Sequence, residues 1–505
     1  MLFVCAGVLG CDGSKVSNAV GSSPPLPPPF DTKLGEGTLA DSTVVQVYPT
    51  SADTGLDGFY QQIACPPNAD SNICNTNTAS LNTSQFGNFD LSTNPIANNA
   101  AGVQKVDAIK VHYTAINVDG TADTVSGGIA MPELPASAIK GLILYFHGTT
   151  TDRTKVPSNF VPLSNSSSYT DGTLLAAVWA SQGYVVAMPD YIGLGDDTSH
   201  PHPYVVYPQQ NAQSGLAMVK AARALLSKNY GLSGTLPFFT TGYSEGGAYA
   251  LEAGKLMQLN SAYASTLQVT LRKVVPLSGF FDLSTTGLSY LFANIQAQGP
   301  PYYVYDVTDS ELSKPYLMAY LVSSYAHYAG ALPSDIFAAP FDPPCSPECD
   351  TLYNLYFTSN SGDDYVIAKS DEYASDAGYL GQQGSSAQPL LTAAYAAALM
   401  NHDITNPLFQ QIASADTYLF TPQFPVTVIS LEQDSIVTRA NSDIAFSYFT
   451  LKNPAGPYQK VLIPNASFET PGYVYGYYEI DHTTELAFMS VLMLNQFNLG
   501  SQQGL

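Results

Sequence analysis

Short apolar runs alternate with amphipathic stretches along most of the chain. The apolar runs have the length and composition of strands that are buried on both faces of a sheet. They lie at 142–146, 184–188, 238–241, 274–277, 426–431 and 461–463. Stretches with apolar residues at helical spacing lie at 173–181, 209–228, 246–257 and 484–495. This alternation predicts an α/β fold, with a mostly parallel central sheet flanked by helices.

Two segments near the start of this pattern alternate apolar and polar residues instead. Residues 106–118 alternate through Ile109, Val111 and Tyr113, and residues 126–131 follow after an Asp-Gly turn. A period of two is typical of strands, so both segments are predicted strands. The region before them, 36–100, is rich in Asn, Ser, Thr and Gly, and we expect an irregular N-terminal extension there.

The alternation is interrupted between two parts of the predicted sheet. Residues 285–423 are rich in Tyr and Ala and prone to form helices, above all at 317–328 and 390–401. A long segment inserted between strands of one sheet is typical of a cap, which divides the predicted α/β core into 101–284 and 424–505. Tyrosines at the start of the cap either pack between its helices, which we favour, or form an aromatic wall for a substrate. They are Tyr302, Tyr303, Tyr305, Tyr316, Tyr320, Tyr325 and Tyr328.

Composition and charge limit the kinds of binding partner that we expect for this protein. Of the 505 residues, 45% are hydrophobic and only 12% are charged, so a sizeable core is available. Lys and Arg number 18 against 41 Asp and Glu, which gives a net charge of −23. A basic face for nucleic acid is therefore not expected, and neither is attraction to anionic lipid headgroups. No apolar stretch long enough for a transmembrane helix follows the N-terminus.

The first 35 residues resemble an export signal followed by a Pro-rich linker. Residues 1–10 are almost wholly apolar, and Val8 to Cys11 resembles a bacterial lipobox, in which the cysteine is lipidated. We therefore expect an exported protein, either secreted or anchored at the outer membrane of a bacterial cell envelope through a lipidated Cys11. The alternatives are a simple secretion signal and a misplaced start without lipid.

Four further cysteines form two pairs that are close in sequence. Cys65 precedes Cys74, and Cys345 precedes Cys349, without the CxxC spacing of a zinc or redox site. An even number of locally paired cysteines indicates two small loop disulfides in an oxidising compartment. The alternative is four free thiols.

One stretch carries residue types that metals bind. Asp196, Asp197, His200 and His202 fall in one segment after a predicted strand. Neither helical nor CxxC-like spacing supports a metal site, so we interpret the segment as a polar loop. We expect no metal and no cofactor.

The chemistry is expected at Gly242-x-Ser244-x-Gly246, which lies between the apolar run 238–241 and a predicted helix. This strand–turn–helix context is that of a nucleophile elbow, in which a sharp turn holds a serine out of the sheet. Gly242 and Gly246 are needed because the strand and helix backbones leave no room for a Cβ. Ser244 then lies at the positive end of the helix, and the Glu245 N–H faces a developing oxyanion.

Three histidines follow Ser244, and this kind of site requires the base to come last in the sequence. His327 and His402 fall in the predicted cap. His482 lies between the last predicted strand and the last predicted helix, where a base reaches a serine at the edge of the sheet. We predict that His482 takes the serine proton and later protonates the leaving group.

The orienting acid is expected just past the apolar strand 426–431. Asp434 has this position, Glu432 is its nearest rival and Asp443 is a weaker one. A buried carboxylate there would make the neutral histidine a better base. We predict Asp434 and leave Glu432 open.

The second N–H of an oxyanion hole is expected in the loop after 142–146. Gly148 lets the backbone approach closely, and the Thr149 N–H is the predicted donor. His147 ends a central strand and precedes Ser244, so we expect it to shape the loop.

Together these stretches resemble the α/β-hydrolase superfamily, and more narrowly its secretory-lipase type of serine esterases and lipases. The resemblance covers about residues 101–497 and is carried by His147-Gly148-Thr149, Met188 to Gly195, His202-Pro203-Tyr204, Gly242 to Gly247 and Ser278 to Ser284. It implies hydrolysis of carboxylic esters, acyl lipids included, by a triad of Ser244, Asp434 and His482. Secretory lipases often carry Gln at position 245, whereas Glu245 would bring a carboxylate near the nucleophile.

The predicted function is that of a serine carboxylic-ester hydrolase that works through an acyl-enzyme. One alternative is a serine peptidase on the same fold, which we disfavour because no propeller repeat is visible. The other is a catalytically silent binding protein. Such proteins typically lack a triad member, and here all three residue types are present.

Overall fold

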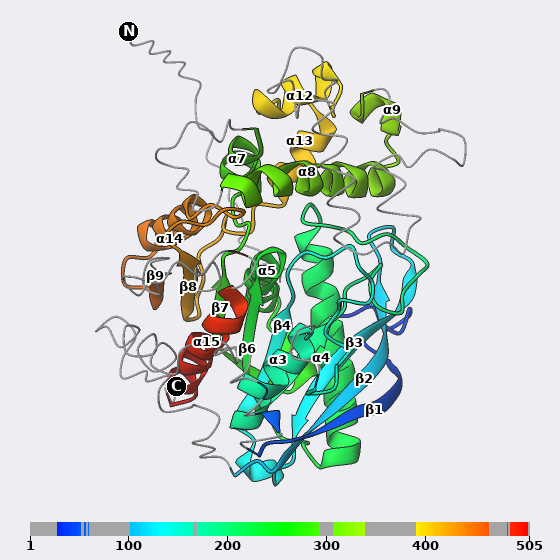
Figure 1. Ribbon diagram of the computed structural model, residues 1–505, viewed down its shortest axis with the longest axis vertical. Helices are drawn as coiled ribbons and strands as arrows, with labels where there is room; N and C mark the ends of the chain where they lie inside the picture. Colours follow the sequence, from blue (N-terminus) through cyan, green and yellow to red (C-terminus); the bar gives the residue numbers. More distant parts are fainter. Residues whose placement is uncertain are drawn as a thin grey trace, which may run out of the picture.

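The computed structural model describes residues 28–51, 55–56, 59, 102–164, 169–292, 307–338, 390–463, 482 and 485–502. Within these ranges nine strands form one sheet, in the order β1-β2-β3-β5-β4-β6-β7-β8-β9 (Figure 1). The strands are β1 (Leu39–Pro49), β2 (Lys105–Ile116), β3 (Ala122–Pro132), β4 (Gly141–Phe146), β5 (Tyr184–Pro189), β6 (Leu236–Tyr243), β7 (Val269–Leu277), β8 (Val426–Leu431) and β9 (Tyr458–Ile463).

The sheet is antiparallel at one side and parallel from β5 to β9. β1, β2, β3 and β5 pair antiparallel in that order, whereas β5, β4, β6, β7, β8 and β9 run parallel. In register, Phe146 of β4 pairs with Gly242 of β6, and Leu277 of β7 pairs with Tyr243 of β6 and Ile429 of β8. The carboxyl ends of these four strands therefore meet at one edge, where loops present side chains together.

Helices cover both faces of the sheet because the central strands are apolar on both sides. In β4, Ile143 and Tyr145 belong to a core shared with α3 and α15, whereas Leu142 and Leu144 belong to a core shared with α4, α5 and α6. A further small core joins α14 to β7, β8 and α5. The bounds are α3 (Asp171–Val178), α4 (Pro208–Tyr230), α5 (Glu245–Leu259), α6 (Ala262–Leu267), α14 (Ala440–Lys452) and α15 (Glu485–Gln502).

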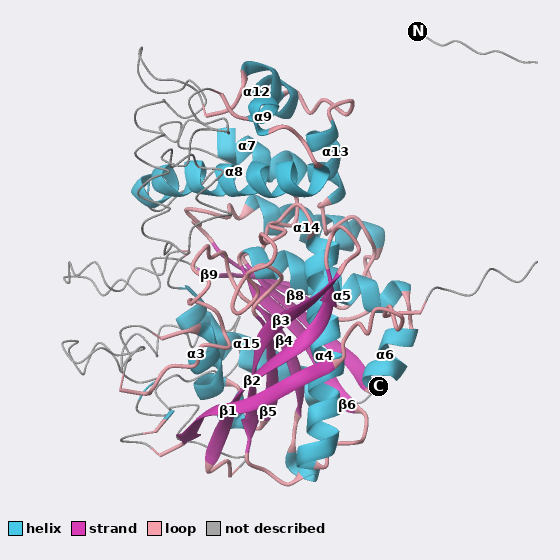
Figure 2. Ribbon diagram, turned by 90° about the vertical axis from the view of Figure 1, so that its right-hand side faces the viewer, coloured by secondary structure: helices cyan, strands magenta, loops and turns pink. Residues whose placement is uncertain are grey.

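A separate group of helices lies beyond one end of the sheet in both views (Figures 1 and 2). It consists of α7 (Leu288–Phe292), α8 (Val307–Ala329), α9 (Pro333–Ile336), α12 (Ala393–Met400) and α13 (Pro407–Ser414). These helices share an apolar core with the segment that follows His202. Tyr316, Tyr320 and Tyr325 are buried in that core, whereas Tyr302, Tyr303 and Tyr305 lie outside the described residues.

One expectation from the sequence is wrong. Residues 39–49, placed in the irregular extension, form the edge strand β1, which pairs with β2 along its length. Val44, Val45 and Val47 of β1 face solvent, so the burial pattern that marks the other strands is missing. The predicted export signal at residues 1–10 and all six cysteines lie outside the described residues. Among the helices that are described, none is both long and apolar enough to span a membrane.

Candidate active site

Ser244 lies at the tight junction between β6 and α5. Its backbone has φ +55° and ψ −121°, a left-handed conformation that costs a non-glycine residue free energy. The turn is held because the Ser244 N–H donates to the Leu277 carbonyl at 3.0 Å. A Cβ on Gly242 would lie 2.1 Å from the Gly246 carbonyl oxygen, and one on Gly246 would lie 2.1 Å from the Phe146 carbonyl oxygen. The elbow therefore requires both glycines.

The structure brings Ser244, His482 and Asp434 together in one hydrogen-bonded chain. His482 Nε2 lies 2.8 Å from Ser244 Oγ, and His482 Nδ1 lies 2.9 Å from Asp434 Oδ2. All three residues are buried. The other oxygen of Asp434 accepts the N–H groups of Ile436 and Val437 at 2.9 and 2.7 Å, which fixes the carboxylate. With Asp434 holding Nδ1–H, Nε2 is free to accept the serine proton.

The rival acids are engaged elsewhere. Glu432 is about half exposed, and its carboxylate lies 3.9 Å from Arg439. Asp443 pairs with Arg439 at 3.1 Å and with Lys460 at 2.5 Å, and these cations, against the opposing effect of burial, hold the pKa of Asp443 below its usual value. The loop after β8 therefore turns Asp434, and not its neighbours, toward His482.

The histidines of the predicted cap are also placed elsewhere. His327 lies near the end of α8, where burial lowers its pKa. His402 follows α12, and its ring stacks on Phe409 with centroids 5.4 Å apart. His147 is buried, its ring stacks on Tyr191 with centroids 4.0 Å apart, and its Nδ1 lies 2.7 Å from the Gly148 carbonyl oxygen. This position fits the shaping role expected for it.

The loop after β4 borders the nucleophile on the oxyanion side. A Cβ on Gly148 would lie 2.7 Å from the Tyr243 ring and 3.6 Å from Ser244 Cβ. Thr149 follows directly, and its hydroxyl lies 3.0 Å from the Tyr204 hydroxyl. Glu245 is the first residue of α5, so its N–H is one of the donors that a helix start leaves without an intrahelical partner. Glu245 thus directly follows the nucleophile, and Thr149 directly follows the glycine whose Cβ position lies 3.6 Å from Ser244 Cβ.

The Glu245 side chain is bound by a histidine and a tyrosine. His202 Nε2 and the Tyr249 hydroxyl each lie 2.6 Å from Glu245 Oε1. The opposite ring nitrogen of His202, Nδ1, lies 3.0 Å from the Ile192 carbonyl oxygen, so the ring is held from both sides. Burial, followed by the nearby charge of Glu245, raises the pKa of Tyr249, which keeps this phenol a donor. The carboxylate is thus fixed by these two partners.

Sequence reasoning missed two contacts to His482. Glu485 is fully buried, and its Oε1 lies 3.3 Å from His482 Nδ1, beside the Asp434 contact. The Tyr243 hydroxyl donates to the His482 carbonyl, which ties the base to the strand that carries the nucleophile. The signal for Glu485 was its position three residues after His482, at the start of a predicted helix.

The four metal-capable residues of the sequence do not converge. Asp196 pairs with Lys110 at 2.6 Å, and His202 binds Glu245. Asp197 and His200 instead group with Asp123, their ligand atoms lying within 4.8 Å of one another. These ligand atoms already bind protein: His200 lies 2.5 Å from Asp123, and Asp197 accepts N–H groups from its own loop. Asp123, Asp197 and His200 thus form a hydrogen-bonded cluster between β3 and the loop after β5.

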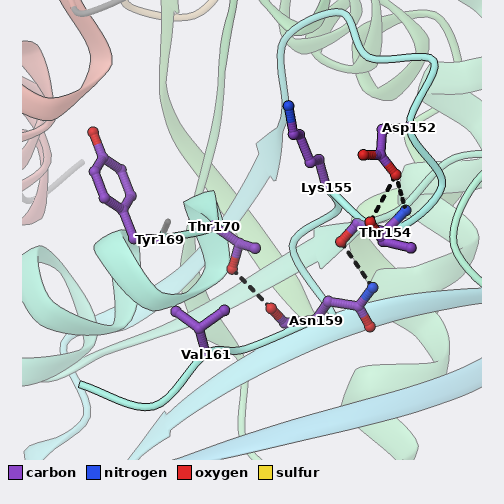
Figure 3. A pocket seen from close by; sticks show the side chains of 7 residues that line it. All are labelled: Asp152, Thr154, Lys155, Asn159, Val161, Tyr169 and Thr170. Carbon is purple, nitrogen blue, oxygen red and sulfur yellow. Dashed lines mark hydrogen bonds between the residues drawn. The ribbon is translucent and has the colours of Figure 1, made fainter. Parts of the chain in front are cut away.

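A hollow of about 650 Å³ lies beside the loop that follows the Thr149 position (Figure 3). Its lining residues are Asp152, Thr154, Lys155, Asn159, Val161, Tyr169 and Thr170. The polar groups there bind one another: Asp152 accepts from Thr154, and Asn159 links Thr154 to Thr170. No member of the triad lines this hollow.

Comparisons with solved structures give the fold. A protein described as a hydrolase from Legionella pneumophila is 19% identical, with a TM-score of 0.64 over 92% of this chain and 99% of that one. The rice cell wall degrading esterase LipA from Xanthomonas oryzae is 19% identical, with a TM-score of 0.62 over 93% and 100%. Candida antarctica lipase A is 13% identical, with a TM-score of 0.52 over 95% and 88%.

Comparisons of the sequence give no further relative. No protein-family model and no curated protein matches the chain. The sheet order, the helices on its two faces and the likeness to these structures agree with one another. The chain therefore has the fold of the α/β-hydrolase esterases and lipases.

Proposed function

We propose that the protein is a serine hydrolase of carboxylic esters that acts through an acyl-enzyme. The observation that carries this proposal is the continuous chain from Ser244 Oγ through His482 to Asp434, with distances of 2.8 and 2.9 Å. The chain lies at a strained elbow whose two glycines admit no Cβ. A purely structural serine has no need of such a conformation.

The reaction follows from this geometry in two halves. Ser244 Oγ attacks the ester carbonyl while His482 Nε2 takes its proton, and the Glu245 and Thr149 N–H groups receive the oxyanion. His482 then gives the proton to the leaving alcohol as the C–O bond breaks, which leaves an ester on Ser244. Water, deprotonated by His482, attacks this acyl-enzyme, and the acid leaves with restoration of the serine proton.

Esters are the proposed substrate class because of the structures that the chain resembles. Two of the three are named an esterase and a lipase, and one of these degrades rice cell wall. We also propose that the protein is exported, since residues 1–35 read as an export signal and linker. Anchoring through a lipidated Cys11 is part of the same proposal and is tested by mass analysis of the mature N-terminus.

Hydrolysis of a p-nitrophenyl ester series, beside aminoacyl-p-nitroanilides, tests the function. We expect ester turnover with a burst of p-nitrophenol close to one equivalent, and loss of at least about 10³-fold in kcat for Ser244→Ala. Preference for the anilides would indicate a peptidase. A folded wild-type protein that is inactive on both substrate classes, with detergent and without, would contradict the proposal.

A further inference from the structure

The base of the triad faces two carboxylates. Asp434 Oδ2 lies 2.9 Å from His482 Nδ1, and Glu485 Oε1 lies 3.3 Å from the same nitrogen. They come from different elements, since Asp434 follows β8 and Glu485 begins α15. Both are fully buried, so water does not screen either of them from the ring.

Glu485 is held in this position from several sides. The Ser278 hydroxyl, just after β7, donates to Glu485 Oε2 at 2.9 Å, which leaves Oε1 toward the imidazole. Ser278 itself has φ +44°, and its N–H is bound to the Ile429 carbonyl, so its position is fixed by the sheet. A carboxylate in the first turn of an 18-residue helix is also stabilised by the helix dipole.

We propose that Glu485 is a positioning residue that acts with Asp434 on His482, as a second acid that sets the pH below which the enzyme loses activity. This inference rests on the proposed serine hydrolase mechanism. Asp434 accepts from Nδ1–H, and Glu485 Oε1 lies 3.3 Å from the same nitrogen, so both carboxylates favour the tautomer that leaves Nε2 to accept the Ser244 proton. Both also stabilise the imidazolium that forms when His482 takes the proton.

The charges around His482 determine the direction of the effect. In the part of the chain that the structure describes, the titratable groups recorded against its ring are Asp434, Glu485, the Ser244 hydroxyl and the Tyr243 phenol. Of these groups, only the two carboxyls have an anionic form near neutral pH. Each anion favours the protonated ring. Removing one anion therefore moves the acidic limb of the pH–rate profile to lower pH.

The test is the pH dependence of kcat/KM on a short-chain p-nitrophenyl ester for wild type, Glu485→Gln and Glu485→Asp. In Glu485→Gln we expect the half-maximal pH of the acidic limb to fall by about half a unit or more, because one buried anion is lost. Glu485→Asp keeps the charge and should keep the wild-type limb. A packing role alone would lower activity equally at every pH, and the shorter Asp would then be the more damaging change.

Variants of Asp434 give a second, independent measurement. In Asp434→Asn, Glu485 remains near Nδ1, so kcat should fall by less than the roughly 10⁴-fold loss that an Asp-to-Asn change causes in a Ser-His-Asp triad. Glu485→Gln should then cost at least about tenfold more in the Asp434→Asn background than in wild type, since the last acceptor is lost.

The inference is overturned if the acidic limb of Glu485→Gln matches wild type, or if the two substitutions act independently. Ser244→Ala separates this failure from that of the proposed function. Full ester turnover by Ser244→Ala would contradict the proposed mechanism itself. An inactive Ser244→Ala beside an unshifted Glu485→Gln would remove only the role of Glu485.

Discussion

At the scale of single residues, the site contains buried carboxylates that are bound by neighbouring side chains. The Glu245 carboxylate is almost wholly inaccessible, yet it follows directly after the nucleophile and is held by His202 and Tyr249 at 2.6 Å each. The His202 ring also stacks on Tyr191 with an interplanar angle of 10°. These contacts fix the first residue of α5, whose N–H is a proposed oxyanion donor.

Breaking this buried pair should therefore be costly. His202→Phe keeps the aromatic stacking but leaves Glu245 without its histidine, so we expect a loss of about 3 to 5 kcal/mol in the free energy of unfolding. Glu245→Gln keeps hydrogen-bonding groups toward both partners and should cost about 1 kcal/mol. Urea unfolding measures both values. The double variant should be more stable than His202→Phe alone, and equal stability would refute the pairing.

At the scale of elements, the elbow between β6 and α5 sets the position of the nucleophile. Gly246→Ala places a methyl group 2.1 Å from the Phe146 carbonyl oxygen, and backbone cannot yield as a side chain does. We expect a loss of about 3 kcal/mol or more in stability, together with loss of ester turnover. Gly234→Ala is the matched control, because nothing lies within 4 Å of its Cβ position. It should stay within about 0.5 kcal/mol of wild type in thermal unfolding.

Another buried carboxylate lies where the sheet meets the group of helices beyond its end. Asp416, just after α13, accepts the Ser284 N–H at 3.0 Å and the Ser284 hydroxyl at 2.5 Å. Burial, opposed by these hydrogen bonds, raises the pKa of Asp416 to about 6. The folded protein therefore binds a proton more tightly here than the unfolded chain does, whose Asp pKa is about 3.9.

The sign of the resulting pH dependence follows from this difference. Between about pH 4 and pH 6 the folded state holds more protons, so the contribution of Asp416 to stability is full below that range and is lost as the pH rises through it. Relative to Asp416→Asn, wild type should lose on the order of 2 kcal/mol between pH 4 and pH 7. Denaturant unfolding at several pH values checks this. A pH-independent difference between the two proteins would contradict it.

Most strands and helices that build the site were predictable, because burial on both faces leaves plain apolar runs such as 142–146 and 426–431. The edge strand β1 was not predictable, since solvent-facing valines such as Val44 remove the pattern. Choosing between Glu432 and Asp434 required the turn in which Asp434 accepts two backbone N–H groups. The sequence placed Glu485 at the start of a predicted helix, but its distance from His482 depends on how α15 packs against the sheet.

At the scale of the whole molecule, a net charge of −23 affects how an ester in a lipid surface is reached. Anionic lipid repels such a protein within about a Debye length, and salt screens the repulsion. We expect turnover of an ester embedded in zwitterionic vesicles to be several-fold faster than in vesicles rich in anionic lipid at low salt. The difference should shrink at high salt. Faster turnover on anionic vesicles would contradict this expectation.

The central claim is that Ser244 is an activated nucleophile, and covalent labelling tests it most directly. A fluorophosphonate reacts with a serine only where a base takes its proton and an oxyanion hole receives the charge. Intact-mass analysis of wild type should show one phosphonyl adduct, mapped to Ser244, while folded Ser244→Ala shows none. A folded wild type that stays unlabelled with detergent and without, or that is labelled at another residue, would contradict the account.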